Sequence, residues 1–466
     1  MVSDISFKLK LMASDTEKAV EKVFEAPAQA LEKSVEVGQQ VGKAFKKQED
    51  LVGNYWKNLG PGLVTGAADD DPSGIATYSQ AGARYGYQFL WMALFTFPLQ
   101  AVVQEMCARI GLVTGRGLAG NIRSYFPKWV MYLCAGLLLF ANTLNIGADL
   151  GAMAQATQLV LPNFSFWLFL VGFTVISILL QVFVTYEKYA KYLKYLTFVL
   201  LSYVAVAFVV GVDWAVVLKH TFLPSIGFGK EELFMICAIL GTTISPYLFF
   251  WQTSQEVEEQ ILEGKTNLAA RRGTDEVQVK KMRIDVWSGM FVSNLVMFFI
   301  IIAGAAALNA NGITNIQTSA QAAEALKPIA GNFAFLLFAL GIIGTGLLAV
   351  PVLAGSGAYA VAESMGWRIG LYRKLKSAYA FYGVIIISII IGALLNTFRI
   401  DPIKMLIFSS VVNGMVAPVV LVLIVLLSSN RKLMGEWVNK KIVSGIGWLV
   451  VVVMALAGIG AIYSFL

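Results

Sequence analysis

Residues 66–74 read GAADDDPSG, and they place three aspartates, a proline and a glycine inside an apolar stretch long enough to cross a membrane. Residues 241–247 read GTTISPY, and they interrupt a second apolar stretch, 233–255, with a proline at a similar depth. Proline removes one helical N–H and displaces the carbonyl four residues earlier, so each interruption predicts a broken helix. Hydrocarbon tolerates a broken helix only where it is buried in protein or lines a cavity. The two interruptions therefore mark the candidate functional site.

The composition of the chain is that of an integral membrane protein. Its 466 residues are 57% hydrophobic and only 14% charged, and the mean hydropathy is +0.69. Soluble domains carry about 25% charged residues, so a large soluble domain, a disordered chain and a nucleic-acid-binding protein are all excluded. The three cysteines lie in apolar runs, which argues against a disulfide framework.

Uncharged windows predict eleven spanning helices, because about 20 apolar residues cross the hydrocarbon core of a bilayer. The predicted spans are residues 60–84, 86–111, 129–159, 165–186, 193–212, 232–261, 285–308, 331–362, 378–396, 402–428 and 443–465. The expected fold class is an all-α membrane protein with about eleven transmembrane helices.

The two interruptions divide residues 56–466 into two blocks of five spans. Residues 56–212 form the first predicted repeat, 232–428 the second, and 443–465 one extra helix. Interrupted segments in matching positions of two halves are typical of transporters with a binding site at the membrane midplane. A pair of ordinary proline kinks is the alternative, although such kinks do not usually bring three adjacent aspartates.

Lysine and arginine predict the orientation of the chain in the membrane. With the N-terminus inside, the cytoplasmic loops carry 20 of these residues and the outer loops 6. This bias predicts a multi-pass protein of the plasma (inner) membrane with a cytoplasmic N-terminus, and the odd number of spans puts the C-terminus outside. Residues 1–55 have apolar side chains at helical spacing among charged ones, which predicts a cytoplasmic amphipathic segment. A partly ordered tail without a function of its own is the alternative.

Acidic residues in the predicted spans are the strongest chemical signal. A carboxylate at the centre of a spanning helix costs about 2.5–3.5 kcal/mol, so it needs a partner or a wet cavity. The acids of the first three spans are Asp69, Asp70, Asp71, Glu105 and Asp149, and Arg109 is the one cation at comparable depth. Uncompensated acids in a membrane favour a bound cation.

Asp71 is the aspartate expected at the ion, because it directly precedes the proline of the first break. Successive residues lie ~100° apart on a helix, so three consecutive aspartates cannot all face one site. A solvated vestibule that concentrates cations is the alternative role for Asp69 and Asp70, and we favour it for Asp69. Asp149 is either a second acid that handles protons beside the site or a structural partner between helices.

Several stretches of this sequence resemble the NRAMP divalent-metal transporter family. They are GPG at residues 60–62, DPSGIAT at 71–77, QAGA at 80–83, ARIGLVTGR at 108–116 and ADL at 148–150. These stretches are similar to the family's first, second and third helices, and the resemblance covers nearly all of residues 56–466. It implies a LeuT-like inverted repeat of five plus five helices with one extra helix, and an activity in divalent-metal transport.

The metal-binding motifs depart from the family pattern in two places. The family's first-helix motif is Asp-Pro-Gly-Asn, and Gly74 stands at the position of its asparagine. The sixth-helix motif is Met-Pro-His, but residues 245–247 are Ser-Pro-Tyr, which removes the thioether and the histidine. The ligands implied by the resemblance are Asp71, Ser245 and the carbonyls of Ala68 and Thr242, with Gly74 supplying room. Other polar residues expected beside the ion or along its pathway are Asp70, Asp149, Tyr247, Glu105, Ser410 and Asn413. For the last two, a polar pair that holds helices together is the alternative.

An all-oxygen site of this kind suits a hard divalent cation. Carboxylate, carbonyl and water oxygens suit Mg²⁺, Ca²⁺ and Mn²⁺, and Mg²⁺ usually keeps several of its waters. The pattern resembles the NRAMP-related magnesium transporters, so the predicted activity is Mg²⁺ transport by alternating access. The alternative is an NRAMP-type transporter of Mn²⁺ or another transition metal, with or without proton coupling. Weak or absent coupling is expected, because Ala152 replaces a family glutamate and the one histidine, His220, lies in an outer loop.

Other function classes are less favoured. An organic-solute carrier of the same fold would hold a carboxylate at its helix breaks, and three aspartates would repel that group. A cation-sensing receptor could signal only through residues 1–55. No histidine cluster, P-loop or nucleophile–base pair in the sequence supports an enzyme. The expected partners are the divalent ion, as substrate rather than cofactor, and the lipid bilayer, while the oligomeric state stays open.

Overall fold

The computed structural model describes residues 60–184 and 200–466. Within these ranges the regular elements are helices, and no β-strand occurs. The predicted amphipathic segment 1–55 and residues 193–199 of the fifth predicted span lie outside the described residues. The observed class is the all-α membrane fold that the sequence predicts.

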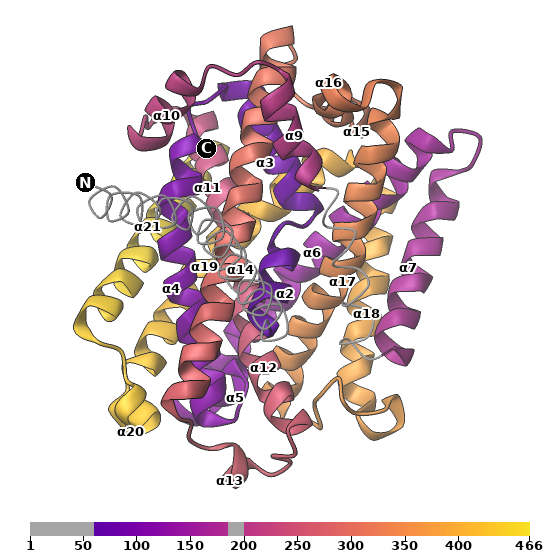
Figure 1. Ribbon diagram of the computed structural model, residues 1–466. Helices are drawn as coiled ribbons and strands as arrows, with labels where there is room; N and C mark the ends of the chain where they lie inside the picture. The colour runs from indigo at the N-terminus through magenta and orange to yellow at the C-terminus, as the bar shows by residue number, and fades with distance from the viewer. Residues whose placement is uncertain (1–59, 185–199) are drawn as a thin grey trace, which may run out of the picture. The chain divides into compact units, whose positions relative to one another are not determined.

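The α-helices of the described ranges are shown in Figure 1. They are α2 (Pro61–Asp69), α3 (Pro72–Tyr85), α4 (Leu90–Thr114), α5 (Leu118–Tyr125), α6 (Lys128–Val160), α7 (Phe166–Phe183), α9 (Leu201–Val209), α10 (Trp214–Phe222), α11 (Lys230–Thr243), α12 (Pro246–Leu262), α13 (Leu268–Arg271), α14 (Glu276–Ala303), α15 (Ser319–Ala323), α16 (Lys327–Ala330), α17 (Ala334–Met365), α18 (Tyr379–Leu395), α19 (Pro402–Ser428), α20 (Arg431–Met434) and α21 (Lys441–Phe465). A π-helical turn, Gly304–Leu308, extends α14.

Nine helical segments of the described ranges are long and apolar enough to cross a membrane. They correspond to the second to fourth and the sixth to eleventh predicted spans. The first predicted span consists of the two short helices α2 and α3, and α9 lies within the fifth. These segments together agree with the prediction of about eleven transmembrane helices.

Helix α14 begins well before residue 285, where the seventh span is expected from the sequence. Asp275 caps its first turn, because the carboxylate accepts a hydrogen bond of 2.8 Å from the backbone N–H of Gln278. In the turns that follow, Val279 and Met282 are buried in an apolar cluster, whereas Lys280 is exposed. The helix extends into this charged segment because only one of its faces has to be apolar there.

Both predicted helix breaks are present. Helix α2 ends at Asp69 and α3 begins at Pro72, while α11 ends at Thr243 and α12 begins at Pro246. Each proline lies in the first turn of the second half-helix, where a missing N–H leaves no intrahelical bond unmade. The breaks are therefore confirmed, whereas the division into repeats 56–212 and 232–428 stays a prediction.

The half-helix α2 is held closely against α14. Within the described part of the chain, α14 packs against α2, α3 and α4, and α6 packs against α17, α18 and α19 (Figure 1). A Cβ atom on Gly66 would lie only 2.3 Å from the carbonyl oxygen of Gly289, so the two backbones touch. The carboxylate of Asp285 on α14 also accepts backbone N–H bonds from Gly60 and Gly62, at 2.9 and 2.6 Å. These bonds satisfy donors at the start of α2 that no helical carbonyl can reach.

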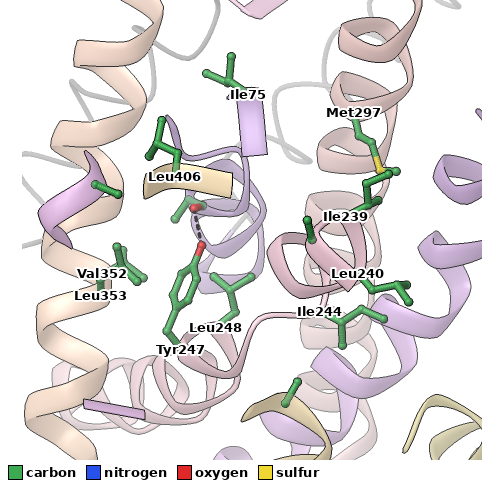
Figure 2. Packing of buried hydrophobic residues seen from close by; sticks show 14 of the residues in the cluster. Ile75, Ile239, Leu240, Ile244, Tyr247, Leu248, Met297, Val352, Leu353 and Leu406 are labelled. Atoms are coloured by element: carbon green, nitrogen blue, oxygen red, sulfur yellow. Dashed lines mark hydrogen bonds between the residues drawn. The ribbon is translucent and has the colours of Figure 1, made fainter. Parts of the chain in front are cut away.

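Apolar side chains surround the second break. Figure 2 shows this shell, which consists of the buried residues Ile75, Ile239, Leu240, Ile244, Leu248, Met297, Val352, Leu353 and Leu406. They come from α3, α11, the break itself, α12, α14, α17 and α19. Tyr247 lies among them and directs its hydroxyl toward the carbonyl of Ala68 on α2. The interior therefore brings the two interrupted segments together inside a largely apolar environment.

Candidate functional site

The carboxylate of Asp71 lies fully buried at the junction of α2 and α3. Its Oδ1 accepts hydrogen bonds from the hydroxyl of Ser73, at 2.5 Å, and from the backbone N–H of Gly74, at 2.8 Å. This arrangement makes Asp71 the N-cap of α3. Its Oδ2 accepts a bond of 2.9 Å from the side-chain amide of Asn145 on α6. One carboxylate thus joins the first break to a second helix.

Asn145 connects Asp71 to two further polar residues. Its amide nitrogen also donates to Asp149 Oδ2 at 3.1 Å, and its carbonyl oxygen accepts from the amide of Asn413 on α19 at 3.2 Å. All four side chains are fully buried. Within the described residues, Asp149 Oδ1 and Asn413 Oδ1 have no hydrogen-bond partner. Buried acceptors without donors are unfavourable in themselves, and these two oxygens are suited to a cation or to its water.

The sequence prediction includes Asp71, Asp149 and Asn413 but not Asn145. Residues 145 and 149 are one helical turn apart and therefore share a face of α6, which is the signal that could have identified Asn145. The structure confirms that these residues lie together. Their role in binding an ion stays a prediction.

At the second break, the hydroxyl of Ser245 bonds back onto its own helix. It donates to the carbonyls of Gly241 and Thr242, each at 2.7 Å. On the other side of the site, the hydroxyl of Tyr247 donates to the carbonyl of Ala68 at 3.1 Å (Figure 2). Neighbouring hydroxyls therefore replace the helical donors that these carbonyls lose at the breaks. Each carbonyl oxygen has a second lone pair, which is still suited to a cation.

Gly74 brings α3 close to α11 instead of opening space. A Cβ atom on Gly74 would lie 3.3 Å from Thr242 Oγ1 and 3.3 Å from the ring of Tyr78. The hydroxyls of Ser73 and Thr242 are 3.4 Å apart across the same contact, and the hydroxyls of Tyr78 and Thr243 are 3.2 Å apart. The prediction that Gly74 supplies room for the ion is thus not met, because α3 and α11 pack closely at the position where the side chain is absent.

Asp69 and Asp70 face away from Asp71. Asp69 Oδ2 accepts hydrogen bonds from the amide of Gln100 on α4, at 2.7 Å, and from the hydroxyl of Ser293 on α14, at 2.5 Å. The same hydroxyl lies 3.4 Å from Asp70 Oδ1. Both carboxylates are buried, so the solvated vestibule suggested for them is not found. In the part of the chain that the structure describes, no three His, Cys, Asp or Glu side chains gather to hold a metal. Asp71 therefore points to a different side of the break from Asp69 and Asp70, which share the hydroxyl of Ser293.

Ser410 contacts helix α3 through a hydroxyl pair. Its Oγ lies 3.2 Å from Oγ1 of Thr77 on α3, and it also donates to the carbonyl of Leu406 one turn earlier on α19. This contact is the kind of polar pair between helices that the sequence offers as the alternative for Ser410.

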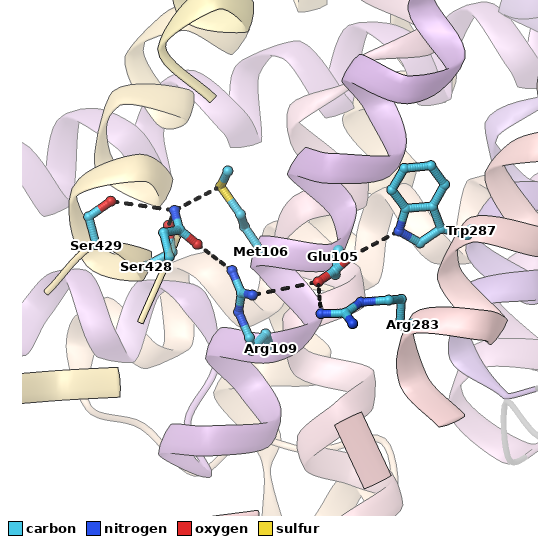
Figure 3. A network of polar contacts seen from close by, with 8 residues as sticks. Glu105, Met106, Arg109, Arg283, Trp287, Ser428 and Ser429 are labelled. Carbon is cyan, nitrogen blue, oxygen red and sulfur yellow. Dashed lines mark hydrogen bonds and ion pairs between the residues drawn. The ribbon is translucent and has the colours of Figure 1, made fainter. Parts of the chain in front are cut away.

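Glu105 belongs to a separate charge network (Figure 3). Its Oε1 lies 2.9 Å from a guanidinium nitrogen of Arg283 and 3.5 Å from one of Arg109, and its Oε2 accepts from the indole N–H of Trp287 at 2.9 Å. Arg109 in turn donates to the side chain of Asn439, in the connection between α19 and α21. The charge of Glu105 is therefore compensated by two arginines. Within the described residues it bonds to none of the partners of Asp71, contrary to the prediction that it lies beside the ion or along its pathway. Arg283 was not predicted as a partner of Glu105, because the seventh span is predicted to begin at residue 285 and α14 begins at Glu276.

A comparison with models of protein families shows to which family this chain belongs. The family model described as "Natural resistance-associated macrophage protein-like" matches residues 62–464. The chain belongs to the NRAMP family. The family resemblance predicted from the helix motifs is thereby confirmed.

Curated NRAMP relatives match the chain over most of its length. A divalent metal cation transporter, MntH, of Klebsiella pneumoniae subsp. pneumoniae is 29% identical over 412 residues, which cover 86% of this chain and 92% of the relative. The MntH protein of Deinococcus radiodurans is 27% identical over 417 residues, with 86% and 88% covered. These named relatives are transporters, which agrees with the expectation that the chain is not an enzyme.

Solved structures of other transporters share the fold of this chain. The manganese transporter of Eremococcus coleocola, in complex with an aromatic bis-isothiourea compound, has a TM-score of 0.69 at 18% identity, covering 88% of each chain. Mhp1, a nucleobase-cation-symport-1 family transporter, has a TM-score of 0.52 at 13% identity, covering 87% of this chain and 91% of the other. Both likenesses support the LeuT-like fold predicted from the sequence.

Proposed function

We propose that this protein carries a hard divalent cation across the membrane by alternating access, with Asp71 as the central ligand. The observation that carries the proposal is the buried carboxylate of Asp71 between two broken helices, with one oxygen directed at Asn145. Ser245 and the carbonyls of Ala68 and Thr242 are the proposed further ligands. Asp149, Asn145 and Asn413 provide the polar surroundings for the ion or its remaining waters.

Mn²⁺ is the first candidate ion. The curated relatives are named divalent metal cation transporters, and a solved structure of the same fold is a manganese transporter. These relatives favour the manganese alternative over the magnesium prediction made from the sequence. The oxygen donors of the proposed site accommodate Mn²⁺ as well as Mg²⁺.

Mg²⁺ is the second candidate, on the basis of one observation. Among the described residues, the hydrogen-bond partners of the side chains of Asp71 and Ser245 are oxygen and nitrogen atoms and include no thioether. A site without sulfur has no strong means of preferring a transition metal over Mg²⁺. Weak or absent proton coupling remains part of the proposal, since Glu105 is held by two arginines and Asp149 is left as the remaining predicted proton carrier.

We also propose an orientation. The loops rich in lysine and arginine support a location in the inner membrane with a cytoplasmic N-terminus and an outer C-terminus. Residues 1–55 form the proposed cytoplasmic segment, 56–212 and 232–428 the two repeats, and 443–465 the extra helix.

The experiment that tests this function is uptake of radioactive Mn²⁺ into liposomes that contain the purified full chain. Asp71→Asn keeps the shape of the side chain but removes its charge, and we expect uptake to fall by about tenfold or more, which corresponds to about 1.4 kcal/mol of binding free energy. Asp213→Asn is the matched control, because Asp213 caps the exposed helix α10 and, within the described residues, makes no hydrogen bond to the site residues. Unchanged uptake by Asp71→Asn would show that the site is misplaced.

Competition in the same liposomes separates the two ions. If Mg²⁺ inhibits Mn²⁺ uptake at concentrations similar to those at which unlabelled Mn²⁺ does, Mg²⁺ binds the same site and stays a candidate substrate. If a large excess of Mg²⁺ has no effect, the magnesium candidate is rejected and Mn²⁺ stands.

A further inference from the structure

A cavity of about 660 Å³ lies at the end of the helices where α5 and α20 are found. It is lined by the last turn of α4, by α5, by the loop that leads into α14, and by α20 with the turn that follows it. None of its lining residues contacts Asp71, so the cavity is distinct from the proposed ion site. Its volume lies in the range of small-molecule binding sites, about 300–1,000 Å³.

Three cations from three separate segments line this cavity. Arg116 follows α4, Arg272 lies in the loop before α14, and Lys432 lies in α20. In residues 60–184 and 200–466, no ion pair joins any of the three to a carboxylate. Glu436 is the one acid among the lining residues. A concave surface with an excess of one charge concentrates its electric field and attracts ions of the opposite charge.

Two of these cations are carried by firmly held backbone. The buried amide of Asn121 donates to the carbonyl of Arg116, at 3.1 Å, and to Thr114 Oγ1, at 3.0 Å, which fixes the turn after α4. On the opposite side, the backbone N–H of Gly273 donates to the carbonyl of Val113 at 2.9 Å. Gly273 has a φ of +88°, which favours glycine, so the loop that carries Arg272 is bound to the end of α4 in a defined conformation.

The polar groups beside the cations suit a phosphate group. Arginine binds phosphate through paired N–H donors, and lysine adds a compact positive charge. Ser124 accepts a hydrogen bond of 2.8 Å from Arg116, which orients that guanidinium, and the hydroxyl-bearing Tyr125 and Thr274 also line the cavity. Basic pockets between membrane helices on the cytoplasmic side bind the headgroups of anionic lipids, and this end carries the loops predicted to be cytoplasmic.

We propose that this cavity is a binding site for a phosphate-bearing anion, either the headgroup of an anionic phospholipid or a soluble phosphate compound. The bound anion would join the end of α4 to the start of α14 and to α20. Trp437, which lines the cavity, also packs against the apolar cluster that includes Leu112 and Met282. The Glu105 network joins α4 to α14 and to Asn439, in the connection that also contains α20 (Figure 3). Binding of the anion therefore stabilises the relative positions of elements that already share an ion-pair network.

The test measures thermal unfolding of the purified full chain in detergent with three added probes. The probes are phosphatidylglycerol, neutral phosphatidylcholine as the lipid control, and inorganic pyrophosphate. We expect phosphatidylglycerol or pyrophosphate to raise the midpoint by about 2 °C or more relative to its control. A shift with phosphatidylglycerol alone identifies a lipid headgroup, and a shift with pyrophosphate alone identifies a soluble ligand. Either result supports the site, whereas no shift with either probe overturns it.

Variants locate the effect in the cavity. The double variant Arg272→Gln/Lys432→Gln should lose the shift, while Lys280→Gln/Lys376→Gln, which removes the same charge from exposed positions outside the cavity, should keep it. An equal loss in both would mean general attraction of anions to a basic surface and would overturn the proposal. If the double variant does not fold, Lys432→Gln alone answers the question, because its exposed side chain is in no ion pair within the described residues.

Discussion

At the scale of single residues, Ser245 is the position where the ion preference of the proposed site can be changed with little disturbance. Cysteine is almost the same size as serine and would place sulfur beside the carbonyls of Gly241 and Thr242. Because soft ions favour sulfur ligands, we expect Cd²⁺ to inhibit Mn²⁺ uptake by Ser245→Cys at a concentration about tenfold lower than for the unmodified protein, equal to about 1.4 kcal/mol. Competition in liposomes measures this difference.

Ser409→Cys is the control for this prediction. Ser409 is also fully buried and also donates to a carbonyl of its own helix, that of Leu406. In the described part of the chain, no hydrogen bond joins its hydroxyl to the residues at the two breaks, so its replacement should leave the sensitivity to Cd²⁺ unchanged. Equal sensitivity of the two variants would mean that Ser245 does not line the ion pathway.

Single residues also show where sequence reasoning succeeds and where it stops. The position of Asp71 could be predicted, because proline interrupts the helix and a carboxylate in an apolar span needs polar partners, which a helix break provides. The surroundings of Gly74 could not be predicted, since a sequence shows that a side chain is missing but not how closely the neighbouring helix packs there. The partners of Glu105 were missed for a similar reason, because Arg283 is distant in the chain and reaches Glu105 only through the packing of α14 on α4.

At the scale of elements, the contact between α2 and α14 depends on glycine. A Cβ atom on Gly289 would lie 2.2 Å from the carbonyl oxygen of Gly62, which is too close for any side chain. Overpacking of this kind usually costs about 1–3 kcal/mol, so we expect Gly289→Ala to unfold at a lower temperature than the unmodified protein. Gly136→Ala on α6 is the control, because nothing lies within 4 Å of the added Cβ. Thermal unfolding in detergent compares the two, and equal midpoints would contradict the close docking of α2.

The helices themselves were largely predictable, because the cost of burying charge in hydrocarbon forces long uncharged windows into spans. The two breaks were predictable from proline and small polar residues. The start of α14 was not, because beyond the hydrocarbon a helix needs only one apolar face and the charged residues of its first turns can remain exposed. The close packing at Gly62, Gly66 and Gly289 could not be predicted from the sequence either, since it depends on which helices become neighbours.

At the scale of the whole molecule, the distribution of lysine and arginine predicts which ends of the helices face the cytoplasm. Cysteine labelling can test this orientation with little background, because Cys107, Cys134 and Cys237 are all buried. Phe228, in the loop before α11, and Val277, at the start of α14, are 79% and 78% exposed and are predicted to lie on opposite sides of the membrane. A membrane-impermeant maleimide applied to intact cells should label Phe228→Cys at once and Val277→Cys only after permeabilisation. Leu466→Cys, at the end of α21, should behave like Phe228→Cys, because eleven spans place the C-terminus outside. The reverse pattern for the first two positions would invert the proposed orientation, and labelling of Leu466→Cys only after permeabilisation would exclude the five spans predicted between Val277 and Leu466.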